Sequence, residues 1–570
     1  MATVELAEQP APRASVVAVS LALLTLLAWG AALLAPGAKY WDDWAVANTD
    51  TLRFARELGL PWIGYVLVAL FALGPWAFKV LAIVSTFVVG LATYGISGRG
   101  LGLTARERWL LAALVVALPL YSTRVLAILS TYSWSLALFF CAWYLLVRRS
   151  PQTPGRGRYV LAAVLFFVSY TTASLLPFTA LPVAHLAYLA VRRDVSLWRG
   201  ILGFIGRYWY LCAAPIVFWV VRSLFLQPYG LYATYNQIGS ADGQLSLTTL
   251  SAVGMIVAIV LICLVFLYWL RATWPRDPAI RGALSLAVLT VATLVFGLYL
   301  NATRVSSNPL ARAVPLVLLA CALVVAAVVI VQMVRIRRGR TLLVSRDREL
   351  TPILAVGLAA LGLAMLPYLL VGKLPSFVGF ETRHQLLMPF GVAIIIVATV
   401  RGAGTIMSAT VTKVLAVALV AAMTALSAVV SLSLVADAHK QEQVIRALAA
   451  EPLVRDASTV VFADNASALG FEGRGYDFYE FNGWMKTAFG DEKRLGLSTA
   501  GVADFLDGNY EPLYYAASRY GFGDYVPTTE GVLVTIDPLD GANWWTMLLD
   551  QPGIELRVSP VADIATLAAP

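Results

Sequence analysis

The sequence predicts an all-α polytopic membrane bundle of about 13 transmembrane helices, followed by a small α/β domain at its C-terminal end. Hydrophobic residues make up 59% of the 570 positions and charged residues only 13%, whereas soluble domains are about 25% charged. Apolar runs of about 20 residues recur along the chain, and this length spans a bilayer as a helix. The composition changes only near residue 436, which separates the two predicted parts.

The first apolar run, 16–35, has the length of a spanning helix rather than of a signal peptide. The polar segment 1–15 that precedes it contains Arg13 but also Glu5 and Glu8. We therefore expect a retained helix whose N-terminal tail, 1–15, lies in the cytoplasm.

Twelve further spans complete the predicted transmembrane domain, 16–435. Lys and Arg gather in alternate loops, most densely in 335–348, and these loops are expected on the cytoplasmic side. An odd number of spans then places the C-terminus outside, in a multi-pass protein of the inner (plasma) membrane. The expected spans are 76–96, 109–121, 125–147, 159–172, 174–191, 208–226, 247–270, 283–300, 313–334, 351–371, 385–400 and 412–435.

The segment 436–570 carries 20 acidic and 9 basic residues, so it is acidic in a chain whose net charge is +9. We interpret it as a separate, soluble extracytoplasmic C-terminal domain, long enough to bury its own core. Runs at 459–463 and 531–536 are typical of short buried strands, and 441–450 and 502–506 of helical pieces.

The outer loop 37–75 contains two adjacent carboxylates in the run Tyr40-Trp41-Asp42-Asp43-Trp44. Carboxylates beside a bilayer are costly and mark functional positions. The rest of the loop mixes aromatic and charged residues, as an amphipathic helix in the interface would. The alternative is that Asp42 and Asp43 form a solvated pair at a helix start and that the tryptophans belong to an interfacial belt.

Cations occur singly at the outer ends of the predicted spans, against the positive-inside bias. In a bundle they can converge around one cavity, where they suit a lipid phosphate opposite an acidic group. Taken one at a time, each Arg is better explained as a side chain that snorkels to the interface; together with the Asp pair, the cations favour a site. These residues are Arg124, Arg222, Arg304, Lys373, Arg383 and His384.

With its cytoplasmic N-terminus, an Asp-Asp pair in the first outer loop, many further spans and an outer C-terminal domain, the chain resembles the GT-C superfamily of membrane glycosyltransferases. Within it, the chain is most similar to bacterial cell-envelope enzymes such as O-antigen glucosyltransferases and arabinofuranosyltransferases. The resemblance covers the architecture of the whole chain, and its one short motif is Tyr40-Trp41-Asp42-Asp43-Trp44.

The resemblance implies an inverting transfer of a sugar from a polyprenyl-phosphate donor to a cell-envelope glycan or lipid acceptor at the outer membrane face. Asp42 or Asp43 would act as general base. Arg383 would lead in binding the donor phosphate, followed by Arg304, Arg222 and Arg124, with help from Lys373 and His384. No cofactor is certain; some members use a divalent cation, and Mg²⁺, Mn²⁺ or Ca²⁺ at Asp42 and Asp43 stays an alternative.

Aromatic side chains in the outer segments fit sugar binding, because their faces stack on sugar rings. We expect the substrate-binding residues to be Tyr40, Trp41, Trp44, Tyr232, Tyr235 and Asn236. The alternative is that such rings are interface anchors or core residues. The same two interpretations hold for aromatic residues of the C-terminal domain, namely Tyr476, Phe478, Tyr479, Trp484, Trp544 and Trp545.

Two other functional classes stay open. A transporter or flippase of lipid-linked sugars would use the same cations to guide a phosphate, and a non-catalytic envelope protein would bind glycan through its C-terminal domain. A flippase needs charged groups through the depth of its central spans, and these are nearly free of them here, which favours an enzyme. The expected partners are membrane lipid, donor and acceptor, and no nucleic acid.

Overall fold

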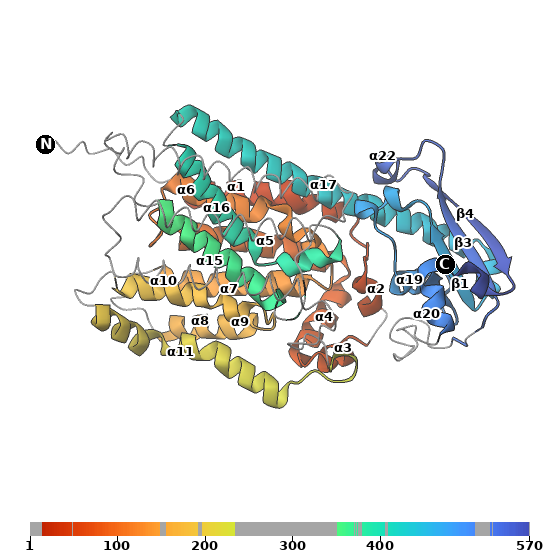
Figure 1. Cartoon of the computed structure of the whole chain (residues 1–570), viewed down its shortest axis with the longest axis horizontal. Coiled ribbons are helices and arrows are strands. Elements are labelled where there is room, and N and C mark those ends of the chain that lie inside the picture. The colour runs from red at the N-terminus through yellow and green to blue at the C-terminus, as the bar shows by residue number, and fades with distance from the viewer. Residues whose placement is uncertain are drawn as a thin grey trace.

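The computed structural model of the chain describes residues 14–47, 50–148, 156–191, 197–233, 350–369, 371, 373, 379–404, 408–507, 525–526 and 528–568. Its helices form an elongated bundle, and a domain with a small sheet lies at one end of it (Figure 1). The predicted spans 247–270, 283–300 and 313–334 lie outside the described residues.

Each of the other ten predicted spans coincides with helical structure. Five described helices are long and apolar enough to cross a membrane, or six if one bent pair counts as a single span. The bundle consists of α1 (Ala14–Trp29), η1 (Gly30–Leu34), α5 (Trp76–Ile96), α6 (Ala105–Ala117), η2 (Pro119–Val125), α7 (Ser130–Val147), α8 (Arg156–Ser169), α9 (Leu175–Phe178), α10 (Ala180–Val191), α11 (Leu197–Phe225), η3 (Gly230–Tyr232), α15 (Leu350–Leu369), η5 (Phe380–Gln385), α16 (Met388–Ala403) and α17 (Ala409–Ala449).

Local sequence explains where the central helices begin, bend and meet. Thr104 and Glu107 form a capping box at the start of α6. Pro119 follows the end of α6, and the chain bends by 54° there before continuing as η2. Small residues let α15 and α16 pack closely, because a Cβ at Gly391 would lie 2.6 Å from the backbone nitrogen of Leu361.

The predicted outer loop 37–75 is mostly helical. It contains three helices, α2 (Asp42–Ala47), α3 (Thr51–Glu57) and α4 (Pro61–Leu73), where the sequence indicated one amphipathic helix. Asp50 caps the N-terminus of α3, because its carboxylate accepts hydrogen bonds from the first backbone N–H groups of that helix. Pro61 starts α4, and Gly74, with φ 105°, ends it.

The helix α17 joins the bundle to the C-terminal domain. It is 41 residues long, so it extends roughly 60 Å at 1.5 Å per residue, about twice the thickness of a bilayer core. The predicted domain boundary at 435/436 therefore falls inside a continuous helix, and Figure 1 shows α17 passing from the bundle into the C-terminal domain.

The C-terminal domain is the small α/β layer that the sequence predicts. Its four-stranded sheet has the order β2-β1-β3-β4, with β1 parallel to β2 and β3, and β4 antiparallel to β3. Its elements are α18 (Pro452–Asp456), β1 (Thr459–Asp464), η6 (Ser467–Leu469), η7 (Phe471–Gly473), α19 (Phe478–Phe489), β2 (Leu495–Ser498), η8 (Thr499–Gly501), α20 (Val502–Leu506), β3 (Gly531–Pro538), α22 (Trp544–Leu548), β4 (Ile554–Val561) and η10 (Ile564–Leu567).

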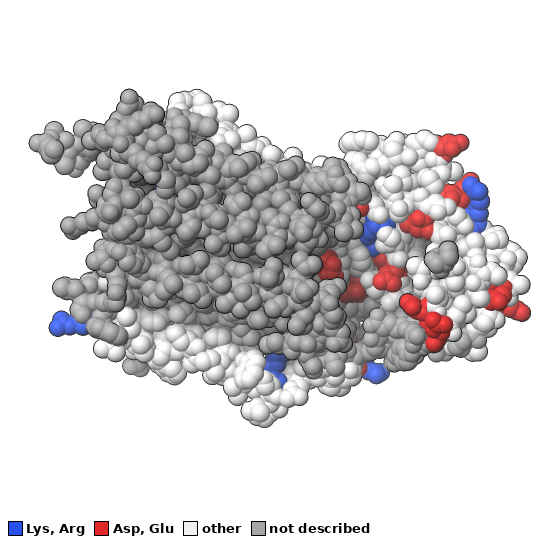
Figure 2. Space-filling view, viewed as in Figure 1, with Lys and Arg blue, Asp and Glu red and all other residues white. Residues whose placement is uncertain are grey.

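Both faces of the central strand β1 are covered. Val460 and Phe462 belong to a core that includes Val444 of α17 and Trp484 of α19. Val461, on the opposite face, packs with residues of β2 and α20. A strand buried on both sides reads as a continuous apolar run, which explains why 459–463 was recognisable. Asp and Glu are spread over the visible outer surface of this domain (Figure 2).

Candidate functional site

Asp43 is a buried carboxylate that accepts three backbone hydrogen bonds. Its Oδ1 accepts from the N–H of Ile128 at 2.8 Å, and its Oδ2 accepts from Ala127 at 3.1 Å and from Tyr40 at 3.3 Å. The side chain thereby ties the start of α2 to the turn before α7. Burial raises the pKa of Asp43 to about 6, although the three N–H donors act to lower it. Its geometry is that of an anchor.

Asp42 precedes Asp43 at the start of α2 but points to a different environment. About a third of its side chain, 35%, is exposed, and its Oδ2 lies 3.7 Å from a terminal nitrogen of Arg383. Desolvation raises the pKa of Asp42 to about 6. The nearby carboxylates of Asp477, Glu480 and Glu381 contribute to this rise, and Arg383 acts against it. Asp42 is thus an accessible carboxylate that can take up a proton near neutral pH.

The short helix η5 supplies the charged partners of Asp42. Arg383 also pairs with Glu381 at 3.1 Å, and Nδ1 of His384 lies 2.8 Å from the other oxygen of Glu381. We call Asp42, Glu381, Arg383 and His384 the Arg383 cluster. Thr382 fixes η5 in place, because its hydroxyl is hydrogen-bonded to hydroxyls of η2.

Lys373 belongs to the same surroundings. Burial and the positive charge of Arg383 together lower its pKa to about 8, although Glu381 acts to raise it. The structure therefore brings together three of the six predicted phosphate-binding residues, Lys373, Arg383 and His384, on one side of Asp42.

Arg124 lies apart from this cluster, inside the bundle. Its guanidinium donates hydrogen bonds to the backbone carbonyls of Tyr121 and Leu118 and lies 4.1 Å from the centre of the Trp29 ring. The adjacent cavity measures about 20 Å³, which is room for about one water molecule. These contacts indicate a packing role for Arg124 rather than the predicted phosphate contact.

The remaining predicted residues are dispersed or undescribed. Arg222 lies in the last turn of α11. Tyr232, in η3, packs edge-on against Phe54 of α3 at 5.8 Å. Arg304, Tyr235 and Asn236 lie outside the described residues.

Three aromatic residues expected to bind substrate are buried in protein contacts instead. Tyr40 donates its hydroxyl to the carbonyl of Leu434 on α17 at 2.7 Å, and Trp44 donates its indole N–H to Gln441 at 2.9 Å. Trp41, 8% exposed, stacks on Phe380 at 5.7 Å. Their rings present no open face to a sugar, so these contacts argue against that expectation: the aromatic run packs α2 against α17 and η5.

The C-terminal domain contributes residues to this region that we did not predict. Glu472, in η7, accepts a hydrogen bond from the N–H of Gly379 just before η5, and burial raises its pKa to about 7. Burial also raises the pKa of Tyr479, with a second contribution from the charge of Asp42. The sequence around Glu472 has no pattern that predicts this hydrogen bond, because its partner Gly379 lies 93 positions away.

Other aromatic residues of the C-terminal domain divide between the two interpretations that the sequence left open. Trp484 is fully buried and Tyr476 is 7% exposed, so both are core residues. Trp545, by contrast, is 62% exposed on α22.

The carboxylates do not fit a bridging divalent cation. Both oxygens of Asp43 already accept backbone N–H groups, and a hard cation needs six or more oxygen ligands. Within the described residues, no group of three or more His, Cys, Asp and Glu side chains is arranged to hold a metal ion. We derive no chemical step through a metal.

No protein-family model matches the sequence, and no curated protein matches it. The structure aligns with the crystal structure of ArnT from Cupriavidus metallidurans bound to undecaprenyl phosphate, over 98% of this chain and 99% of that chain. The sequence identity is 15% and the TM-score is 0.29.

Proposed function

We propose that the protein is an inverting membrane glycosyltransferase that moves a sugar from a polyprenyl-phosphate donor to a cell-envelope glycan or lipid. The observation that carries the proposal is the contrast between two neighbouring carboxylates. Asp43 is held by three N–H donors, whereas Asp42 is partly exposed beside Arg383. A reactive base must be accessible, so Asp42 is the better candidate of the two.

In the proposed reaction, Asp42 accepts the proton of the acceptor hydroxyl while that oxygen attacks the anomeric carbon. The bond between this carbon and the donor phosphate oxygen breaks, and the configuration at carbon inverts. The lipid phosphate leaves with its negative charge. Arg383 and Lys373 stabilise this charge, because cations near a leaving phosphate lower the barrier. The site faces outward at the end of the bundle that bears the C-terminal domain, as the distribution of basic loops favours.

Transfer of radiolabelled sugar tests the proposal. Purified protein in lipid nanodiscs is given a panel of polyprenyl-phosphate sugars and an envelope extract. We expect transfer by the wild type and a loss of about 10²- to 10⁴-fold in Asp42→Asn, the range for a general base. The matched control is Asp50→Asn. Asp50 is an exposed carboxylate of the same loop that caps α3, and Asn caps a helix equally well.

Two other outcomes would replace the proposal. If donor lipid binds but no donor is turned over, and Asp42→Asn leaves binding unchanged, the flippase hypothesis becomes the better one. If no donor binds but the isolated envelope glycan does, the protein is a glycan-binding envelope component.

A further inference from the structure

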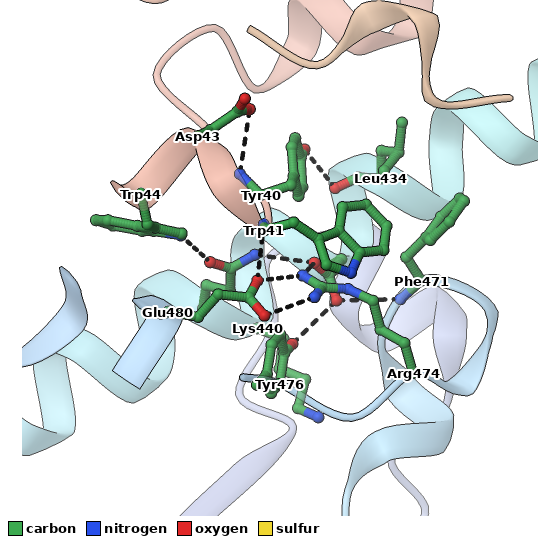
Figure 3. A network of polar contacts seen from close by, with 12 residues as sticks. Tyr40, Trp41, Asp43, Trp44, Leu434, Lys440, Phe471, Arg474, Tyr476 and Glu480 are labelled. Carbon is green, nitrogen blue, oxygen red and sulfur yellow. Dashed lines mark hydrogen bonds and ion pairs between the residues drawn. The ribbon is translucent and has the colours of Figure 1, made fainter. Parts of the chain in front are cut away.

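A buried ionic junction connects α17 to the C-terminal domain, and we call its members Asp437, Arg474 and Glu480 the Arg474 junction (Figure 3). Arg474 forms two parallel bonds with Glu480, at 2.8 and 2.7 Å, and a third bond with Asp437 at 2.9 Å. The side chains of Asp437 and Glu480 are fully buried, and that of Arg474 is 7% exposed. Such bidentate geometry is specific to arginine.

This junction continues into the segment that carries Asp42. Oε1 of Glu480 accepts the backbone N–H of Trp41 at 3.1 Å. The guanidinium of Arg474 lies over the Trp41 ring, 4.0 Å from its centre. Figure 3 shows Trp41 beside the Arg474–Glu480 pair, with the Asp43 side chain turned away from them. The residue immediately before Asp42 is therefore held through both its backbone and its ring.

Trp41 needs such a hold, since its backbone adopts φ 46°. This left-handed conformation is strained for a residue with a large side chain. It persists only where surrounding contacts fix it, and here Glu480 and Arg474 of the C-terminal domain supply two of those contacts. The conformation of Trp41 sets the direction in which Asp42 leaves the turn.

A second ring contact of Trp41 leads to the Arg383 cluster. The Trp41 ring stacks on Phe380 at 5.7 Å with an interplanar angle of 25°, and the guanidinium of Arg383 lies 3.8 Å from the centre of the Phe380 ring. The order Arg474, Trp41, Phe380, Arg383 thus runs from the C-terminal domain to the partner of Asp42. Cation–π contacts bound the stack at both ends.

Trp44 packs the segment 40–44 against the C-terminal domain. Its ring packs over Gly483 of α19, where an added Cβ would lie 2.5 Å from the Trp44 ring. Trp44 belongs to the hydrophobic core of the C-terminal domain although it lies in α2. Tyr40 and Trp41, by contrast, belong to the hydrophobic core of the bundle, so the segment 40–44 packs against both parts of the molecule.

We propose that Arg474 is a positioning residue: it holds Trp41 and so sets the placement of Asp42 against Arg383. The proposal rests on the proposed function for the importance of Asp42, but the hold itself is independent of any activity. The C-terminal domain then acts as the scaffold of the site, in addition to any binding of acceptor.

Arg474→Lys tests whether Arg474 fixes the position of Trp41, because lysine keeps the positive charge and lacks the planar guanidinium group. The matched control is Arg494→Lys, a second buried arginine of the same domain. Arg494 pairs with Asp491 and lies over the Phe489 ring, 4.2 Å from its centre. It also donates hydrogen bonds to the backbone carbonyls of Val454 and Arg455, so these partners all belong to the C-terminal domain. The first measurement is hydrogen exchange of peptides covering 38–47 in nanodiscs.

We expect at least a tenfold faster exchange of this segment in Arg474→Lys and no change in Arg494→Lys. In the transfer assay, kcat should fall about 10- to 100-fold in Arg474→Lys with KM for the donor within threefold, since a small misplacement of a reacting group acts on the chemical step. Arg494→Lys should keep kcat within twofold of the wild type.

Unchanged exchange of 38–47 in Arg474→Lys would overturn the proposal, and so would an equal loss of kcat in both variants. If Arg474→Lys does not fold, Glu480→Gln replaces it; this variant keeps the acceptor for the Trp41 N–H and weakens the pairing with Arg474, and a two- to fivefold faster exchange is expected. A wild type without transfer would remove the proposed function while the exchange data still decide the hold.

Discussion

The Arg383 cluster and the Arg474 junction lie on the two sides of Trp41 and use the same residue types in different ways. In the junction every charge is buried and paired at 2.7 to 2.9 Å. In the cluster Asp42 keeps a distance of 3.7 Å from Arg383 and remains a third exposed. Tight pairing fixes a structure, whereas a loosely paired, accessible carboxylate is free to exchange a proton. The comparison assigns a structural role to the Arg474 junction and a chemical role to the Arg383 cluster.

The largest expected effect on stability comes from breaking the junction. Arg474→Ala leaves Asp437 and Glu480 buried without their cation, and removal of one partner from a buried ion pair costs about 3–5 kcal/mol. Arg383→Ala removes a cation from a partly exposed pair and should cost less than about 1 kcal/mol. Unfolding of both variants in mixed micelles measures the difference. Equal losses in the free energy of unfolding would contradict the distinction between the Arg474 junction and the Arg383 cluster.

A smaller loss is expected from Asp43→Ala. It leaves the N–H groups of Tyr40, Ala127 and Ile128 without their acceptor, and unpaired buried groups cost about 1–3 kcal/mol. Asp42→Ala, one residue earlier, should change the free energy of unfolding by less than about 0.5 kcal/mol. The same unfolding assay compares them, and a larger loss at Asp42 would reverse their assigned roles.

The pH dependence of transfer sharpens the assignment of Asp42. The carboxylate is the active form of a base, so the rate should be constant above its pKa of about 6 and fall on acidification. One pH unit below that pKa, at about pH 5, the rate should be about tenfold lower. Glu472 also has a raised pKa, about 7, and Glu472→Gln serves as the control that should keep the same profile. A flat profile from pH 5 to 8 would contradict a base with this pKa.

The smallest expected effect concerns Glu381, whose charge helps to raise the pKa of Asp42. Glu381→Gln removes this negative charge, so that Arg383 interacts more strongly with the carboxylate of Asp42. The acid limb of the rate profile should move to lower pH, with less than about a threefold rise in rate near pH 5.5. Glu492→Gln, which removes a glutamate paired with Lys486, should leave the limb in place. A shift toward higher pH would disprove the electrostatic account.

The sequence predicted the architecture well where single segments carry the signal. Apolar length located ten helical stretches among the described residues, and the continuous runs at 459–463 and 531–536 located β1 and β3. It missed β4, although Ile554 to Val558 alternates apolar and polar residues as a half-buried strand does. The strand β2 is four residues long, which is too short for a periodic pattern.

The candidate site could be predicted only in part, because it depends on contacts between distant segments. The Asp-Asp pair and Arg383 were recognisable as charges at a membrane boundary. Which carboxylate is anchored follows from backbone N–H groups at 127 and 128, and no side-chain pattern reports these. The burial of Trp41 likewise depends on Arg474 and Glu480, hundreds of residues away.

The hydrogen bond from Trp41 to Glu480 joins residues 439 positions apart, and this has a consequence for biogenesis. The first helix and its following turn leave the ribosome early, but their partner emerges only after the last span and much of the C-terminal domain. A chain that stops before residue 474 would contain Asp42, Asp43 and Arg383 but neither Arg474 nor Glu480, which contact the ring and the backbone of Trp41. We therefore expect prematurely terminated chains to be inert in the membrane.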